Sequence, residues 1–296
     1  MLYAASLAFA PLLSQGYLLV LLTDILVFAL FAASLHFMMG PGGMASFGHA
    51  AFFGLGAYGA GLLVLRLAAP MEVALLAAPL FAFAGALFAG WFCVRLSGVY
   101  LAMLTLAFSQ IAWSVAFQWD AVTGGSNGLI GVWPAPWLAS KPAYFYLALV
   151  LCGTAVALLW RTIFSPFGFA LRAARDSPLR AEALGIAVRA VQWAAFTIAG
   201  TLAGVAGALF AFSKGSISPE VLSVPRSVDA LVMVLLGGVQ TLTGAVWGAG
   251  LFTWLEDSVS REIEYWRAGI GAVIVLLVLA FPQGVAGFVK EKLARP

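Results

Sequence analysis

Residues 17–61, YLLVLLTDILVFALFAASLHFMMGPGGMASFGHAAFFGLGAYGAG, consist of an apolar run, a glycine-rich break and a second apolar run. The first run, 17–39, contains one charged side chain, Asp24. A helix that crosses the hydrocarbon core of a bilayer needs about 20 mostly apolar residues. The stretch therefore predicts two membrane-spanning helices with an interruption between them.

The rest of the chain has the same character. Of its 296 residues, 63% are hydrophobic and 9% are charged, whereas a soluble domain has about 25% charged residues. A water-soluble fold of this size has too little interior to hide so much apolar surface. Further runs of spanning length are 47–66, 72–94, 99–119, 144–162, 191–212, 228–255 and 266–286. Because the two-residue alternation of a transmembrane barrel is missing, we predict an all-α, polytopic transmembrane helix bundle of about eight segments in a single domain, 1–296.

The distribution of charge predicts the topology. The interval 161–190 holds five of the fifteen basic residues, so the positive-inside rule makes it cytoplasmic. The loop 120–143 has one basic residue, Lys141, and counting spans makes it periplasmic. The C-terminal tail is basic, at Lys290, Lys292 and Arg295, and is expected to be cytoplasmic as well. That placement requires 228–255 to enter and return on the same side, and a tilted full span is the alternative.

Two glycine-rich breaks, one in each half, form a weak internal repeat. Gly42-Gly43 is followed by Ser46 and Gly48, and Gly237-Gly238 is followed by Thr241 and Gly244. Matching interrupted helices in two halves point to a transport site. The unpaired N–H groups of a helix that starts inside the membrane suit a carboxylate or an amide oxygen.

Individual residues of the first break have specific expected roles. We predict that Ser46 caps the helix that follows and that His49 faces a polar cavity. His36, in the middle of the preceding span, is expected to be a hydrogen-bonded interior residue. The alternative for the glycines is close packing of helices, as in the patterns Gly200xxxGly204 and Gly244xxxGly248.

The polar interval contains signals for two short helices. Ser165-Pro166 and Ser177-Pro178 each begin a helix, and Gly185 ends the second. Helical spacing puts Arg172 and Arg175 on one face. A compact helical loop, 163–190, is typical of an element that docks into a groove on a partner. The alternative is a loop that contacts only solvent and lipid headgroups.

The sequence excludes several function classes. The spans hold almost no ionisable residues of the kind that proton- or sodium-coupled carriers use. The chain has no GxxxxGK[ST] phosphate-binding loop and no HExxH or GxSxG motif, so it is not expected to be an enzyme. Cys93 and Cys152 lie in apolar runs and indicate no disulfide. We expect no metal site and no nucleic-acid partner, and any ATP that drives transport must bind another polypeptide.

Five stretches resemble the permease subunits of bacterial branched-chain amino-acid ABC importers, of the LivM type. They are MASFGHAAFFGLGAY (44–58), YLAMLTLAFSQI (100–111), TGGSNGL (123–129), SPFGFALRAARDSPLRAEALGI (165–186) and LVMVLLGGVQTLTGAVWGA (231–249). Their order matches the family along nearly the whole chain. The resemblance implies a subunit of the bacterial inner membrane that works with a second related permease, two cytoplasmic ATPases that bind ATP and Mg, and a periplasmic substrate-binding protein.

The resemblance also implies roles for particular residues. The substrate pathway would be lined by Ser46, Gly48, His49, Thr105, Gln110, Thr241 and Gly244. ATPase coupling would use Gly168, Arg172, Arg175, Asp176, Glu182 and Gly185. The periplasmic loop would meet the binding protein through Thr123, Gly124, Gly125 and Asn127. Related permeases carry urea, short amides or aromatic compounds, so the substrate stays open between these and branched-chain amino acids. An ATP-independent channel is the alternative of a different class.

Overall fold

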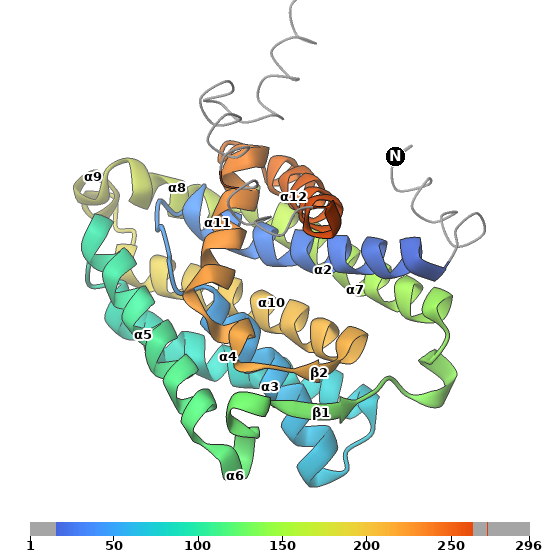
Figure 1. Cartoon of the computed structure of the whole chain (residues 1–296). Coiled ribbons are helices and arrows are strands. Elements are labelled where there is room, and N and C mark those ends of the chain that lie inside the picture. The colour runs from blue at the N-terminus through green and yellow to red at the C-terminus, as the bar shows by residue number, and fades with distance from the viewer. Residues whose placement is uncertain (1–15, 263–270, 272–296) are drawn as a thin grey trace, which may run out of the picture.

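The computed structural model describes residues 16–262 and residue 271, and these residues form a bundle of long helices (Figure 1). The helices long and apolar enough to cross a membrane are α2 (Gly16–Met39), α3 (Ala50–Leu67), α4 (Met71–Cys93), α5 (Gly98–Gln118), α7 (Lys141–Ile163) and α10 (Val188–Lys214). A bent pair, α11 (Val224–Gly237) and α12 (Leu242–Glu262), is a seventh candidate. The all-α polytopic bundle is confirmed. Apart from residue 271, the predicted last span, 266–286, and the basic tail lie outside the described residues.

Shorter elements connect these helices. They are α6 (Asp120–Thr123), η1 (Gly125–Asn127), β1 (Leu129–Val132), η2 (Pro136–Leu138), α8 (Pro166–Asp176), α9 (Pro178–Ala183), β2 (Gly215–Ile217) and η3 (Pro219–Leu222). The strands pair antiparallel, with Leu129 opposite Ile217. The sequence predicted no strand, because segments of three or four residues are too short for a two-residue alternation to be visible.

Helix α10 lies at the centre and packs against α2, α3 and α4. Small residues allow the backbones to touch: a Cβ on Gly56 would lie 2.1 Å from the Gly204 carbonyl oxygen, and one on Gly207 would lie 1.8 Å from that of Phe53. Gly200 and Gly204 also face the methyl groups of α4. The packing expected of the Gly200xxxGly204 pattern is therefore present, in the manner of membrane helices.

The outer faces of α4 and α5 are apolar. Leu76 and Phe88 of α4 and Met103 and Ile111 of α5 are all exposed. Monomeric soluble proteins rarely expose contiguous apolar patches of that kind. Together with the six spanning helices, these faces identify a multi-pass membrane protein.

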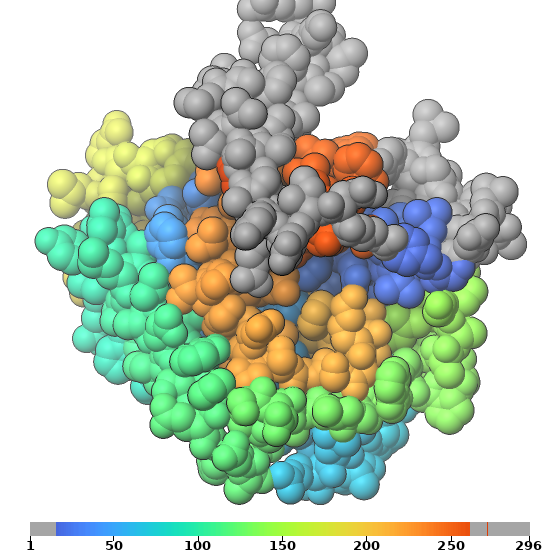
Figure 2. Space-filling view, in the orientation of Figure 1, coloured from blue at the N-terminus to red at the C-terminus, as the bar shows by residue number. Residues whose placement is uncertain are grey.

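The connections define two ends of the bundle. Helix α7 runs from the β1 end to α8, and α10 returns from α9 to β2. The α8–α9 hairpin (residues 166–183) and the small sheet therefore lie at opposite ends of these two helices, and the hairpin projects from one corner of the surface (Figure 2).

The bent pair, α11 and α12, starts after β2, turns by 117° next to His36, and comes back to the start of α2, where Tyr17 bonds Asp257. The return predicted for 228–255 stays a prediction, because a pair bent in this way fits a broken span as well as a re-entrant loop.

Candidate functional site: a cavity beside two helix breaks

The first break, residues 40–49, is an extended connection between α2 and α3. It lies tightly against α5: the Phe47 N–H donates to the Thr105 hydroxyl at 3.2 Å, and a Cβ on Gly48 would lie 1.9 Å from the Thr105 carbonyl oxygen. Gly48 is therefore required by close backbone approach. Two of the predicted pathway positions, Gly48 and Thr105, are in direct contact.

The predicted cap at Ser46 is wrong. Helix α3 begins at Ala50, and the buried Ser46 hydroxyl accepts from the Gly48 N–H at 3.3 Å within the break itself. The first N–H of the helix is satisfied from α11 instead, because the Ala50 N–H donates to the Ser227 hydroxyl at 3.0 Å. Nothing local in the sequence indicates this cap, since its two residues are far apart along the chain.

His49 lies in packed interior. Its side chain is fully buried, its Nε2 is 2.8 Å from the Ser34 hydroxyl, and its ring stacks on Phe31. It does not line the large cavity described below. Gln110, also predicted to line the pathway, is exposed on α5. The transport roles of both residues stay predictions.

The second break, residues 238–241, is a sharp turn between α11 and α12. A Cβ on Gly237 would lie 1.8 Å from the Gly244 carbonyl oxygen, so the two helices touch where they meet. Thr241 precedes α12, and its hydroxyl accepts from the Gly244 N–H at 3.2 Å, which is the geometry of a helix N-cap. His36 reaches the break from α2 and donates from Nε2 to the Val239 carbonyl at 3.0 Å. The interior hydrogen bond expected of His36 is confirmed.

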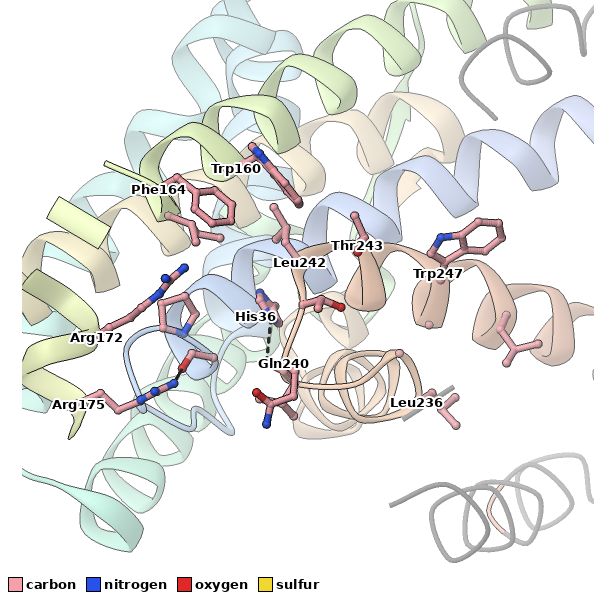
Figure 3. Close-up of a pocket in the computed structure, with 18 residues that line it drawn as sticks. His36, Trp160, Phe164, Arg172, Arg175, Leu236, Gln240, Leu242, Thr243 and Trp247 are labelled. Carbon is pink, nitrogen blue, oxygen red and sulfur yellow. Dashed lines mark hydrogen bonds between the residues drawn. The ribbon is translucent and has the colours of Figure 1, made fainter. Parts of the chain in front are cut away.

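A cavity of about 1100 Å³ lies between the two breaks and the hairpin (Figure 3). Its walls come from both breaks and from the helices beside them, α2, α7, α8, α11 and α12, and they are mostly apolar. The residues that give it polar or aromatic character include His36, Trp160, Phe164, Arg172, Gln240 and Thr241. Of the predicted pathway residues, Thr241 lines this cavity, whereas Ser46, Gly48, His49, Thr105, Gln110 and Gly244 do not.

The two arginines of α8 have different surroundings. Arg175 donates from Nη1 to the Gly40 carbonyl at 2.7 Å, and from Nε and Nη2 to Asp176 at 2.9 and 2.7 Å. Arg172 lies over the rings of Phe164 and Phe169, at 5.4 and 5.6 Å from their centres. Both line the cavity, but only Arg175 binds the first break.

The model of the family described as branched-chain amino acid transport system, permease component, matches residues 17–279 of this chain. The chain belongs to this family. The permease LivM of Escherichia coli K12, from a high-affinity branched-chain amino acid transport system, is 28% identical over 90% of this chain and 69% of its own length. LivM of Salmonella typhimurium is 27% identical over 92% and 70%.

A permease of another import system matches about half of this permease. The autoinducer 2 import permease LsrC of Photorhabdus laumondii is 30% identical over 49% of this chain and 44% of its own. The solved structure of PsaBC from Streptococcus pneumoniae in complex with Fab covers 97% of this chain and 99% of its own, with 14% identity and a TM-score of 0.49.

The permease hairpin has the two short helices that the sequence predicted, but the predicted cap at Ser177 is wrong. Ser165 caps α8 by accepting from the Gly168 N–H at 3.4 Å. A Cβ on Gly168 would lie 2.2 Å from the Ile163 carbonyl oxygen, so the turn from α7 into α8 requires glycine. Gly185 follows α9 with φ +83°. Glu182 is exposed on α9, and Ser177 precedes α9 without a side-chain cap.

The segment 123–128 of the permease is a tight turn between α6 and β1. Gly124, Gly125 and Gly128 all have positive φ, which explains the glycine-rich motif. The Thr123 hydroxyl is buried 2.6 Å from the Ala116 carbonyl, whereas Asn127 is exposed. Of these positions, Asn127 is the one with a side chain free to reach a partner surface.

The sequence did not predict one ion pair of the permease. Asp24, nine residues into α2, binds Lys214 at 2.6 Å, at the end of α10. Arg226 lies near them, over the Phe28 ring. A lysine near the predicted end of one span and an aspartate inside another are the only signals that sequence offers for such a pair.

Proposed function

We propose that this chain is the permease subunit of an ATP-binding-cassette importer for branched-chain or related amino acids in a bacterial inner membrane. The observation that carries the proposal is the similarity to LivM over 90% of the chain, which runs through both helix breaks and the hairpin. ATP and Mg would bind to two partner ATPases, because the sequence has no phosphate-binding loop.

The hairpin supports docking of an ATPase. On α9, Leu179 is 82% exposed and Leu184, which ends it, is 81% exposed. Burying two large apolar side chains at the tip of a basic hairpin in an apolar groove of a soluble partner is more favourable than leaving them exposed to water. The opposite end of the bundle, residues 120–143, would face the periplasm and meet a substrate-binding protein.

The cavity supports an amino-acid substrate. Its walls are mostly apolar, and the Arg172 guanidinium lies at its edge. A carboxylate with an aliphatic side chain matches that combination, since arginine binds carboxylates in a fork geometry. Urea has no apolar part that would use these walls, and a short amide has only a small one and no carboxylate.

The decisive experiment starts from the protein in its own membranes. The tagged chain is purified from its bacterium, co-purifying proteins are identified by mass spectrometry, and the complex is reconstituted into liposomes to which the substrate-binding protein is added. We expect a second permease and an ATPase to co-purify, and we expect ATP-dependent uptake of labelled leucine that isoleucine and valine inhibit.

Two outcomes would contradict the proposal. Flux through the chain alone, without ATP, would identify a channel or facilitator. ATP-dependent uptake that responds to urea, short amides or aromatic compounds, and not to leucine, would retain the importer and replace its substrate.

A further inference from the structure

The hairpin is bound to the first break through the whole length of Arg175. The guanidinium Nη1 donates to the Gly40 carbonyl at 2.7 Å. The aliphatic part lies over Gly43, where an added Cβ would be 2.5 Å from the Arg175 Cγ. Gly43 also has φ +65°, a conformation that favours glycine. The first break is therefore shaped to receive this side chain.

Asp176 holds the guanidinium in this position. Its Oδ1 accepts from Nε and from Nη2 of Arg175, at 2.9 and 2.7 Å. The pair is exposed, and an exposed ion pair adds only about 0–1 kcal/mol to stability. Its structural effect is orientation: the nitrogen that remains, Nη1, points at Gly40.

The first break is in turn bound to the second. His36 donates from Nε2 to the Val239 carbonyl at 3.0 Å, and its own carbonyl accepts from the Gly40 N–H at 2.7 Å. A Cβ on Gly40 would lie 2.9 Å from the His36 Nε2 and 3.0 Å from the Val239 oxygen. Hairpin, first break and second break therefore meet at Gly40.

We propose that Arg175 and His36 are positioning residues that connect the hairpin to both helix breaks, so that a displacement of the hairpin moves two walls of the cavity together. The proposal rests on the proposed function, because an ATPase would supply the displacement. The proposal changes the role that the sequence suggested for Arg175. Three nitrogens of Arg175 already bind within the chain, so this residue connects parts of the chain and does not contact the ATPase.

The connection inside the chain is tested first, without any partner. Hydrogen–deuterium exchange is measured on the purified chain for Arg175→Gln, which removes the charged fork and keeps much of the length. We expect amides in 40–44 to exchange about threefold faster or more, because their contact with α8 is lost. The same measurement on His36→Phe is expected to speed exchange in 238–245.

The matched control is Arg161→Gln, which removes an exposed guanidinium from α7 outside the hairpin. Unchanged exchange in 40–44 for Arg175→Gln would overturn the proposal, whatever the partners of the chain are. Equal acceleration in the control would overturn it as well.

Coupling is tested in the complex from native membranes. For Arg175→Gln we expect the ATPase to stay bound and to hydrolyse ATP, while solute imported per ATP falls about tenfold, within the usual range of coupling energies. Arg175→Lys, which restores one donor to Gly40, is expected to recover part of that loss.

Three results separate the explanations. Release of the ATPase by Arg175→Gln would make Arg175 a docking residue and overturn the proposal. Wild-type import per ATP in that variant would overturn it too. Absence of any ATPase from the wild-type preparation would instead contradict the proposed function, and the exchange experiment would still decide whether the connection exists.

Discussion

The two helix breaks look alike in sequence but are built differently. The first, 40–49, is an extended segment bound by residues of α5 and α8, and α11 binds the first residue of α3 directly after it. The second, 238–241, is a short turn held by the contact of α11 with α12, by its own cap at Thr241 and by the bond from His36 to the Val239 carbonyl. The first break is therefore bound from several distant elements, whereas the second is held within its own two helices and reached from α2 through His36.

The largest expected effects come from the glycines that allow each close approach. Gly48→Ala forces the first break away from α5, and Gly237→Ala forces α11 away from α12, because a Cβ would lie within 2 Å of a backbone oxygen in both cases. Overpacking usually costs about 1–3 kcal/mol, and we expect each variant to lose stability at the upper end of that range or above it. The measurement is the apparent melting temperature in detergent.

Gly153→Ala is the matched control for that pair. Gly153 lies inside α7 with nothing within 4 Å of an added Cβ, so alanine should be neutral or stabilise by up to about 1 kcal/mol. A similar loss in the control would mean that the packing of the breaks is not the cause. Proteolysis then sharpens the comparison, since only Gly48→Ala should expose α5.

Ser227→Ala is expected to have the next largest effect. It leaves the Ala50 N–H without its partner at the buried start of α3, which costs about 1–3 kcal/mol. Ser227→Thr retains the hydroxyl and is the conservative control. Equal melting temperatures for Ser227→Ala and wild type would show that the first break does not depend on α11.

Thr241→Ala tests the second break in the same way. The cap is local, so its loss is expected to cost about 1 kcal/mol, in the typical range for N-caps. Thr241→Ser should restore most of it. A loss of stability larger than that of Ser227→Ala would reverse the comparison, because the second break would then depend more on its side-chain cap than the first does.

Ser46→Ala is expected to have the smallest effect. Its bond to the Gly48 N–H is long, at 3.3 Å, and stays inside the break, so we expect about 0.5 kcal/mol, the low end for a hydrogen bond. Uptake by the complex should be measured beside the melting temperature. Lost uptake at unchanged stability would support the pathway role that the sequence predicted for Ser46.

Features that depend on local sequence were predictable. The apolar runs gave six spans to within a few residues, the glycine pairs gave both breaks, and Ser165-Pro166 gave the start of α8. Each of these signals acts between neighbours in the chain, through length, backbone conformation or a cap three residues away.

Features that join distant segments were not predictable. Ser227 caps a helix that begins at Ala50, β1 pairs with β2, and Asp24 binds Lys214, each across many intervening residues. The sequence predicts a pathway lined from both breaks and from α5, but of the predicted residues Thr241 lines the cavity and Ser46 and His49 do not, because their burial is decided by neighbours in space.

The exposed leucines of α9 have a consequence for how a cell makes this protein. Leu179 and Leu184 would stay uncovered on any copy that lacks a partner at the hairpin. Quality-control chaperones and membrane proteases recognise exposed apolar surfaces, so we expect surplus copies to be degraded. The abundance of the chain would then follow the supply of whatever protein covers that tip.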